Sequence, residues 1–222
     1  EVIDLLEESG ARASFYTLAR FRPPGYLDQI AARIPEERQM NPSLGLFTCM
    51  RQGNAEVVEL LLQHKPEISS DILVGALWGP IGGYEEWMDK PKVVRLLLEH
   101  GVDLGSSGHA TILHRLSVPQ GPFGRHGSSS LAGHYRERRL EVAAMLLDHG
   151  ADLEGRDPDF GSAPLVWAAG KGDRPMVDFL LERGAVVEPD NGIDDRTSPI
   201  GWARRHDHQE IANLLSSHLP TG

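Results

Sequence analysis

The sequence predicts a mainly α-helical solenoid in which antiparallel helix pairs stack along the chain. A nine-residue amphipathic pattern recurs with a period near 35 residues, and a shorter apolar segment begins thirteen residues before several of its copies. The apolar positions of the pattern fall at i, i+1, i+3 and i+4, which is one face of a helix. A single helix pair cannot bury such a face, so we expect neighbouring pairs to stack and share a core.

The nine-residue pattern predicts the longer helix of each pair. Its copies are VVELLLQHK from Val57, VVRLLLEHG from Val93, VAAMLLDHG from Val142, MVDFLLERG from Met176 and, more weakly, VIDLLEESG from Val2 and IANLLSSHL from Ile211. Three intervals between copies are 34 to 36 residues, whereas Val93 and Val142 are 49 residues apart. That interval predicts an insertion. The glycine that often follows the pattern fits a helix C-terminus, where a left-handed residue ends the helix.

The shorter apolar segments predict the first helix of each pair. They begin at Leu44, Thr111, Ala163 and Ser198, and the last two carry proline at the first helical position, where its missing N–H costs nothing. The segments Ala163–Gly172 and Thr111–His114 resemble the T-P-L-H-x-A-A-x-x-G signature of ankyrin repeats. The segments GVDLG from Gly101, GADLE from Gly150 and GAVVE from Gly184 resemble the link that enters the family's β-hairpin.

This resemblance implies a single ankyrin-repeat domain over residues 1–222, made of antiparallel helix pairs with short β-hairpin links. Residues 41–219 follow the repeat, and residues 1–40 resemble degenerate N-terminal repeats. Two insertions, at about 79–91 and 118–137, fall in the turn between paired helices. We expect these two loops to be neighbours, because their repeats are adjacent.

Composition narrows the function classes. The net charge of -10 argues against a nucleic-acid partner, which needs clustered Lys and Arg. The sequence contains no run of 18 or more apolar residues, so we expect no membrane-spanning helix. The one cysteine, Cys49, excludes an internal disulfide and indicates a reducing compartment, the cytoplasm or the nucleus.

The histidines do not indicate a metal or catalytic site. Four of the ten recur at the eighth position of the nine-residue pattern, near a helix C-terminus where a cation is favoured: His64, His100, His149 and His218. His114 matches the histidine of the ankyrin signature, which in that family bonds backbone between repeats. We find no Cys-x-x-Cys pair, phosphate-binding loop or nucleophile motif, and we therefore expect no cofactor, no metal and no catalytic residue.

The resemblance implies a protein-interaction module, a scaffold that binds a protein or peptide on its concave face. Trp167 and Trp202 occupy the same repeat position 35 residues apart, so we expect them side by side on successive inner helices. They serve either as core packing or as aromatic anchors for a partner. The candidate partner-binding residues are Arg51, Trp78, Tyr84, Trp87, Phe160, Trp167, Trp202, Asp194 and Asp195.

The predicted hairpin tips of the last two repeats carry a row of acidic residues: Asp157, Asp159, Asp194 and Asp195. These residues either form a solvent-exposed edge with no binding role, which we favour, or a binding site for a basic peptide.

Two other functions stay open at this stage. An enzyme could build a pocket from the insertions, which supply Tyr84, Glu85, Glu86, Asp89, His126, His134 and Tyr135 as acid–base groups. No spacing among them demands catalysis, and we favour a binding module. Alternatively, the chain is a regulatory ankyrin domain of a larger protein, because it opens at Glu1 within a helical pattern and we expect a segment before it. The oligomeric state stays open.

Overall fold

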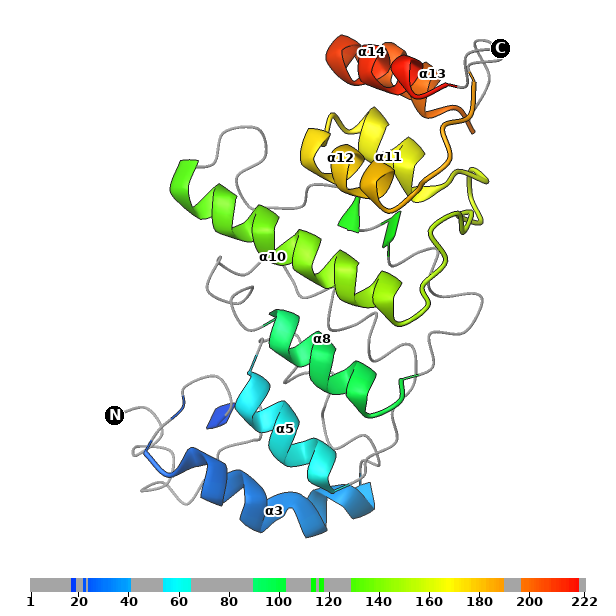
Figure 1. The fold of residues 1–222 in the computed structure, drawn as a ribbon. Coiled ribbons are helices and arrows are strands. Elements are labelled where there is room, and N and C mark those ends of the chain that lie inside the picture. The colour runs from blue at the N-terminus through cyan, green and yellow to red at the C-terminus, as the bar shows by residue number, and fades with distance from the viewer. Residues whose placement is uncertain are drawn as a thin grey trace. The chain divides into compact units, whose positions relative to one another are not determined.

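The described part of the chain consists mainly of α-helices (Figure 1). The structure, a computed structural model, describes residues 17–18, 22, 24–40, 54–64, 90–102, 113–114, 116–117, 129–189 and 197–219. Its helices are α3 (Tyr26–Met40), α5 (Ala55–Gln63), α8 (Lys90–Glu99), α10 (Ser129–Asp148), α11 (Pro164–Gly170), α12 (Arg174–Glu182), α13 (Pro199–Arg205) and α14 (Gln209–Ser217). The mainly α-helical class is therefore confirmed.

The links between pairs differ from the predicted β-hairpins. Among the described residues, the links at 149–163 and 183–189 contain turns and no strand. The first link instead closes on Asp157, whose N–H donates to the Ser162 carbonyl at 3.0 Å and whose own carbonyl accepts from Gly161 at 2.9 Å. Its side chain accepts hydrogen bonds from further N–H groups of the same turn. Bonds to this side chain therefore stabilise the link in place of the backbone bonds of a β-hairpin.

The contacts divide the chain into two compact units, Glu1–Asp103 and Leu104–Gly222. In the first unit, α5 packs against both α3 and α8 (Figure 1). Its core is formed by apolar side chains on the facing sides of these helices: Ile30, Ile34, Val57, Val58, Leu61, Val93, Val94 and Leu97. The prediction that residues 1–222 form one continuous domain stays a prediction.

In the second unit, two helix pairs stack as expected. The shorter helices α11 and α13 pack on one another, each longer helix packs on its partner, and α12 also contacts α10 (Figure 1). The shared core is apolar and fully buried, and it includes Val142, Leu146, Leu165, Ala168, Val177, Leu180, Ile200, Ala203, Ala212 and Leu215. Stacking thus buries the faces that the nine-residue pattern predicted.

Local signals explain where these helices begin and end. Pro164 and Pro199 stand at the starts of α11 and α13, as predicted. Asp173 caps α12 by accepting the Met176 N–H, and Ser198 caps α13 by accepting the Gly201 N–H at 3.1 Å. At the end of α12, Gly184 has a φ of +89°, the left-handed geometry that favours glycine there.

Three of the repeated histidines close helix C-termini. The Nδ1 atoms of His100 and His149 lie 2.8 Å from the carbonyls of Leu96 and Met145, and that of His218 lies 2.9 Å from the Leu214 carbonyl. A carbonyl only accepts, so each Nδ1–H donates to a backbone carbonyl in the last turn of its helix. Their recurrence is therefore a property of the repeat, and not the mark of a metal site.

The last part of the second predicted insertion is helical, because α10 begins at Ser129, within the range 118–137. Leu, Ala, Arg and Glu residues between 131 and 138 are good helix formers, and they extend the repeat helix towards its N-terminus. The first predicted insertion also ends within a helix, because α8 begins at Lys90. The rest of both insertions lies outside the described residues.

Candidate functional site

An aromatic cluster joins the link before α11 to the helices α11 and α13. It consists of Phe160, Trp167, Trp202 and His206. The centroids of the Trp167 and Trp202 rings are 6.1 Å apart, which confirms that the two indoles are neighbours. Phe160 contacts both, at 5.7 Å from Trp167 and 6.2 Å from Trp202, and His206 lies 5.7 Å from Trp202. These distances are those of favourable aromatic pairs.

The cluster is partly open to solvent. Phe160 keeps 39% of its surface exposed, whereas Trp167 and Trp202 are half-buried and His206 is exposed. Half-burial is compatible with core packing, and the interpretation of Trp167 and Trp202 as anchors for a partner stays a prediction. One part of each indole supports its neighbour, and another part reaches the surface.

Asp157 holds two members of this cluster in place through hydrogen bonds. Its Oδ1 accepts the N–H groups of Asp159 at 3.0 Å and Phe160 at 2.7 Å. Its Oδ2 accepts the Ser162 N–H at 3.0 Å and the Trp167 indole N–H at 3.1 Å. Asp157 was expected at an exposed acidic tip, and this was wrong, because its carboxylate accepts four hydrogen bonds and the residue is only 6% exposed.

The same donors determine the charge state of Asp157. Burial alone would raise the pKa of its carboxyl, because a charge is costly away from water. The hydrogen bonds from the Trp167 indole and from the backbone of Phe160, Ser162 and Asp159 outweigh burial and hold this pKa below its usual value of 3.8. The carboxylate is thus ionised near neutral pH.

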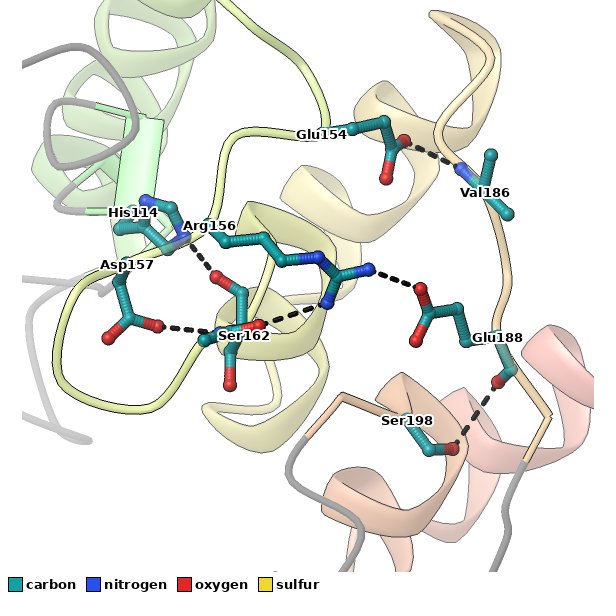
Figure 2. Close-up of polar contacts among 9 residues, drawn as sticks. His114, Glu154, Arg156, Asp157, Ser162, Val186, Glu188 and Ser198 are labelled. Carbon is teal, nitrogen blue, oxygen red and sulfur yellow. Dashed lines mark hydrogen bonds and ion pairs between the residues drawn. The ribbon is translucent and has the colours of Figure 1, made fainter. Parts of the chain in front are cut away.

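His114 connects an earlier helical turn to the cluster. Its Nε2 lies 2.6 Å from the Ser162 carbonyl, which gives it the backbone bond that the resemblance implied for this position (Figure 2). Its ring meets Trp167 edge to face, with centroids 6.3 Å apart. The side chain is 4% exposed, and among the residues that the structure describes Nδ1 has no hydrogen-bond partner.

Polar contacts tie successive links together beside the cluster (Figure 2). Arg156 forms an ion pair with Glu188 and donates to the Gly161 carbonyl at 2.9 Å. Glu154 accepts the Val186 N–H at 2.8 Å, and the Ser198 hydroxyl donates to the Glu188 carbonyl at 3.3 Å. Several link carboxylates are therefore engaged within the protein.

A buried ion pair joins α10 to the N-terminus of α12. Arg139 of α10 lies 2.5 Å from the Asp173 carboxylate and donates to the Leu116 carbonyl at 3.0 Å. Both side chains are almost completely buried, at 3% and 4% exposure. The sequence did not single out either residue, because no local pattern distinguishes Arg139 from Arg136 and Arg138 before it.

Six of the predicted partner-binding residues lie outside the described residues: Arg51, Trp78, Tyr84, Trp87, Asp194 and Asp195. The acid–base groups of the enzyme alternative also lie there, except for His134 and Tyr135, whose backbone is part of α10. Of the predicted set, the structure brings together Phe160, Trp167 and Trp202. Sequence reasoning missed Asp157 as their anchor, although an aspartate that opens a turn is a known signal.

The described part of the chain offers no metal site, since no three His, Cys, Asp or Glu side chains gather there to hold an ion. No helix in this part is long and apolar enough to cross a membrane.

Comparisons with known proteins agree on the kind of repeat. Residues 131–221 match the family model described as ankyrin repeats (3 copies). The chain is similar to "Ankyrin repeat protein nuc-2" of Neurospora crassa, with 31% identity over 125 residues, 56% of this chain and 10% of the relative. It is also similar to "Ankyrin repeat and KH domain-containing protein mask-1" of Caenorhabditis elegans, with 22% identity over 207 residues, 88% of this chain and 7% of the relative. The chain thus spans a tenth or less of the length of these relatives.

Proposed function

Because this chain is an ankyrin repeat protein, a kind of repeat that generally mediates binding between proteins, we propose that its aromatic cluster is the surface that holds a protein or peptide partner. The observation that carries this proposal is the contact between half-buried Trp167 and Trp202 and the exposed ring of Phe160. Tryptophan and other aromatic residues are enriched at the centres of interfaces, where a few of them supply most of the affinity.

Exposure supports this choice. Among the described residues, the large apolar side chains that are exposed are Phe160 and Val186. Phe160 rests on two indoles, so a partner that covers it also gains contact with the half-buried part of the cluster. Val186 is aliphatic and lies in the following link, with its N–H bonded to Glu154. It therefore offers a matched control for apolar exposure alone.

Preorganisation also supports the proposal. Asp157 holds the Phe160 backbone and the Trp167 indole at the same time, so both rings are positioned before a partner arrives. A rigid aromatic surface loses less conformational freedom on binding than a flexible one.

The test is a selection of binding peptides from a displayed random library, with the full chain as bait. The selected peptides are then measured against wild type, Phe160→Ala and Val186→Ala by isothermal titration. We expect Phe160→Ala to weaken binding roughly tenfold or more, the loss typical of a truncated hot-spot side chain. Val186→Ala should leave affinity unchanged. Peptides that bind all three proteins equally would place the binding surface elsewhere.

A regulatory role within a longer protein is compatible with this function. The relatives named above are at least ten times longer than the matched part, so a repeat segment can act on other parts of the same polypeptide. The same cluster would then bind an intramolecular segment.

A further inference from the structure

We propose, building on the binding function proposed above, that His114 makes the aromatic cluster sensitive to pH, because protonation of its imidazole breaks the arrangement of Ser162, Asp157 and Trp167. The residues that carry this proposal belong to one connected network. His114 contacts Ser162 and Trp167, and Asp157 bonds both of these residues.

The neutral ring of His114 has a defined tautomer. A carbonyl oxygen has no hydrogen to donate, so the 2.6 Å contact with the Ser162 carbonyl requires the proton on Nε2. Nδ1 then carries a lone pair, and it lies buried without a hydrogen-bond partner in the described part of the chain. A bare ring nitrogen in an apolar position costs little compared with a buried charge.

Protonation changes this balance. It adds an N–H donor at Nδ1 and a positive charge to a side chain that is 4% exposed. A buried charged donor without an acceptor is strongly unfavourable, and the ring relieves it by turning towards water or towards a carboxylate. Either movement breaks the bond to Ser162 or the edge contact with Trp167.

The charged groups around the ring do not remove this penalty. From the link before α11, the Asp157 carboxylate favours the protonated ring, as does the bond to the Ser162 carbonyl. Burial outweighs both, so the pKa of His114 lies below its usual value of 6.5. From α10, Arg139 bonds the carbonyl of Leu116, two residues along the chain, and its charge is paired with Asp173.

The consequence for the cluster follows from the shared partners. Ser162 presents its carbonyl to His114 and its N–H to Asp157, so a shift of this residue moves both bonds (Figure 2). Asp157 in turn holds the Trp167 indole and the Phe160 backbone. As pH falls below 6.5, the cluster is expected to lose its geometry while the helices remain folded.

The test follows the indole N–H signal of Trp167 by NMR in the full chain between pH 7.5 and 4.5, with far-UV circular dichroism as the measure of helix content. The signal is assigned with Trp167→Phe. The key variant is His114→Gln, whose amide keeps a donor for Ser162 and does not titrate in this range. The control is His149→Gln, which removes an exposed histidine directly after α10 whose ring donates to the Met145 carbonyl of that helix.

We expect the indole signal of wild type to shift in a single step below pH 6.5 at constant helix content. The step should persist in His149→Gln and disappear in His114→Gln. The same step in His114→Gln would overturn the proposal, and so would simultaneous loss of the signal and the helices. If His114→Gln does not fold, the ring C–H signals of His114 in wild type decide: the proposal requires them to titrate together with the Trp167 indole.

A second readout separates this proposal from the binding function. A peptide selected at pH 7.5 should lose affinity as the pH falls below 6.5, in step with the indole signal. In His114→Gln this loss should be absent. If no peptide binds at any pH, the proposed function fails, while the indole signal still tests the network. If the indole signal shifts while the peptide affinity stays constant, the proposed effect of pH on binding is contradicted.

Discussion

Gly170 and Trp202 are in such close contact that a Cβ atom at position 170 would lie 2.6 Å from Cε3 of the indole. This glycine ends α11, and the indole belongs to α13 of the next helix pair. The absence of a side chain at position 170 is therefore what allows Trp202 to lie against α11 and reach Trp167.

Gly170→Ala should displace Trp202 from the cluster. We expect the free energy of unfolding to fall by about 1–3 kcal/mol, the usual cost of overpacking, measured by chemical denaturation. Near-UV circular dichroism should also lose intensity, because the two indoles no longer contact each other. In a Trp202→Ala background the same substitution should cost nothing, since alanine favours helix over glycine by about 1 kcal/mol. An equal cost in both backgrounds would show that Trp202 is not the neighbour that matters.

Asp157→Asn should loosen the link before α11. The amide keeps one acceptor oxygen, but its NH₂ group faces donors, so buried N–H groups lose their partner. We expect a loss of about 1–3 kcal/mol in unfolding free energy, measured in urea at pH 7. The neighbouring Asp159→Asn changes an exposed carboxylate and should have no measurable effect. Equal stability of the two variants would contradict the role of Asp157 as an anchor.

The stability contributed by Asp157 should depend on pH in the acid range. Its pKa is lower in the folded protein than the ordinary 3.8, so its contribution is fully present above about pH 3.8. That contribution is lost as pH falls from 3.8 through the folded-state pKa, because the unfolded chain then binds the proton more readily. The unfolding free energies of wild type and Asp157→Asn are measured in urea at several pH values from 5 to 2.5. The difference between the two proteins should shrink only below about pH 4. A difference that is constant over this range would contradict the prediction.

Arg139→Met should destabilise the second unit strongly. It leaves the buried Asp173 carboxylate without its cation, a change that typically costs about 3–5 kcal/mol. Arg138→Met is a matched control, because Arg138 is adjacent in sequence and its ion pair with Glu141 is partly exposed to solvent, at 39% and 35%. Exposed pairs contribute about 0–1 kcal/mol, so thermal unfolding of the control should resemble wild type. Similar losses in both variants would mean that burial of the pair is not decisive.

Asn54→Ala should weaken the start of α5 in the first unit. Its side chain is buried and accepts the Val57 N–H at 3.2 Å, and losing such a cap costs about 0.5–2 kcal/mol. Asn54→Ser keeps a capping oxygen and should recover most of the stability in chemical denaturation. If serine and alanine behave alike, the cap is not what stabilises this helix end.

The sequence by itself determined the kind of architecture, because the signals for a helix pair lie within a few residues of one another and recur along the chain. The spacing of apolar residues from Val142 and Met176, the prolines at Pro164 and Pro199, and the glycine at Gly184 each depend on interactions within a few residues, and the structure confirms them. Similarly, the equal repeat positions of Trp167 and Trp202 were sufficient to predict that their rings meet.

Only the tertiary structure decided how individual polar side chains are used. Asp157 resembles any acidic residue of an exposed turn until the Trp167 indole and three backbone N–H groups are placed around it. Arg139 and Arg138 are neighbours in sequence, yet burial against Asp173 separates their roles. Gly170 has a function only because Trp202 lies above it. Burial and hydrogen-bond partners at these positions come from residues distant along the chain, and a local pattern does not contain them.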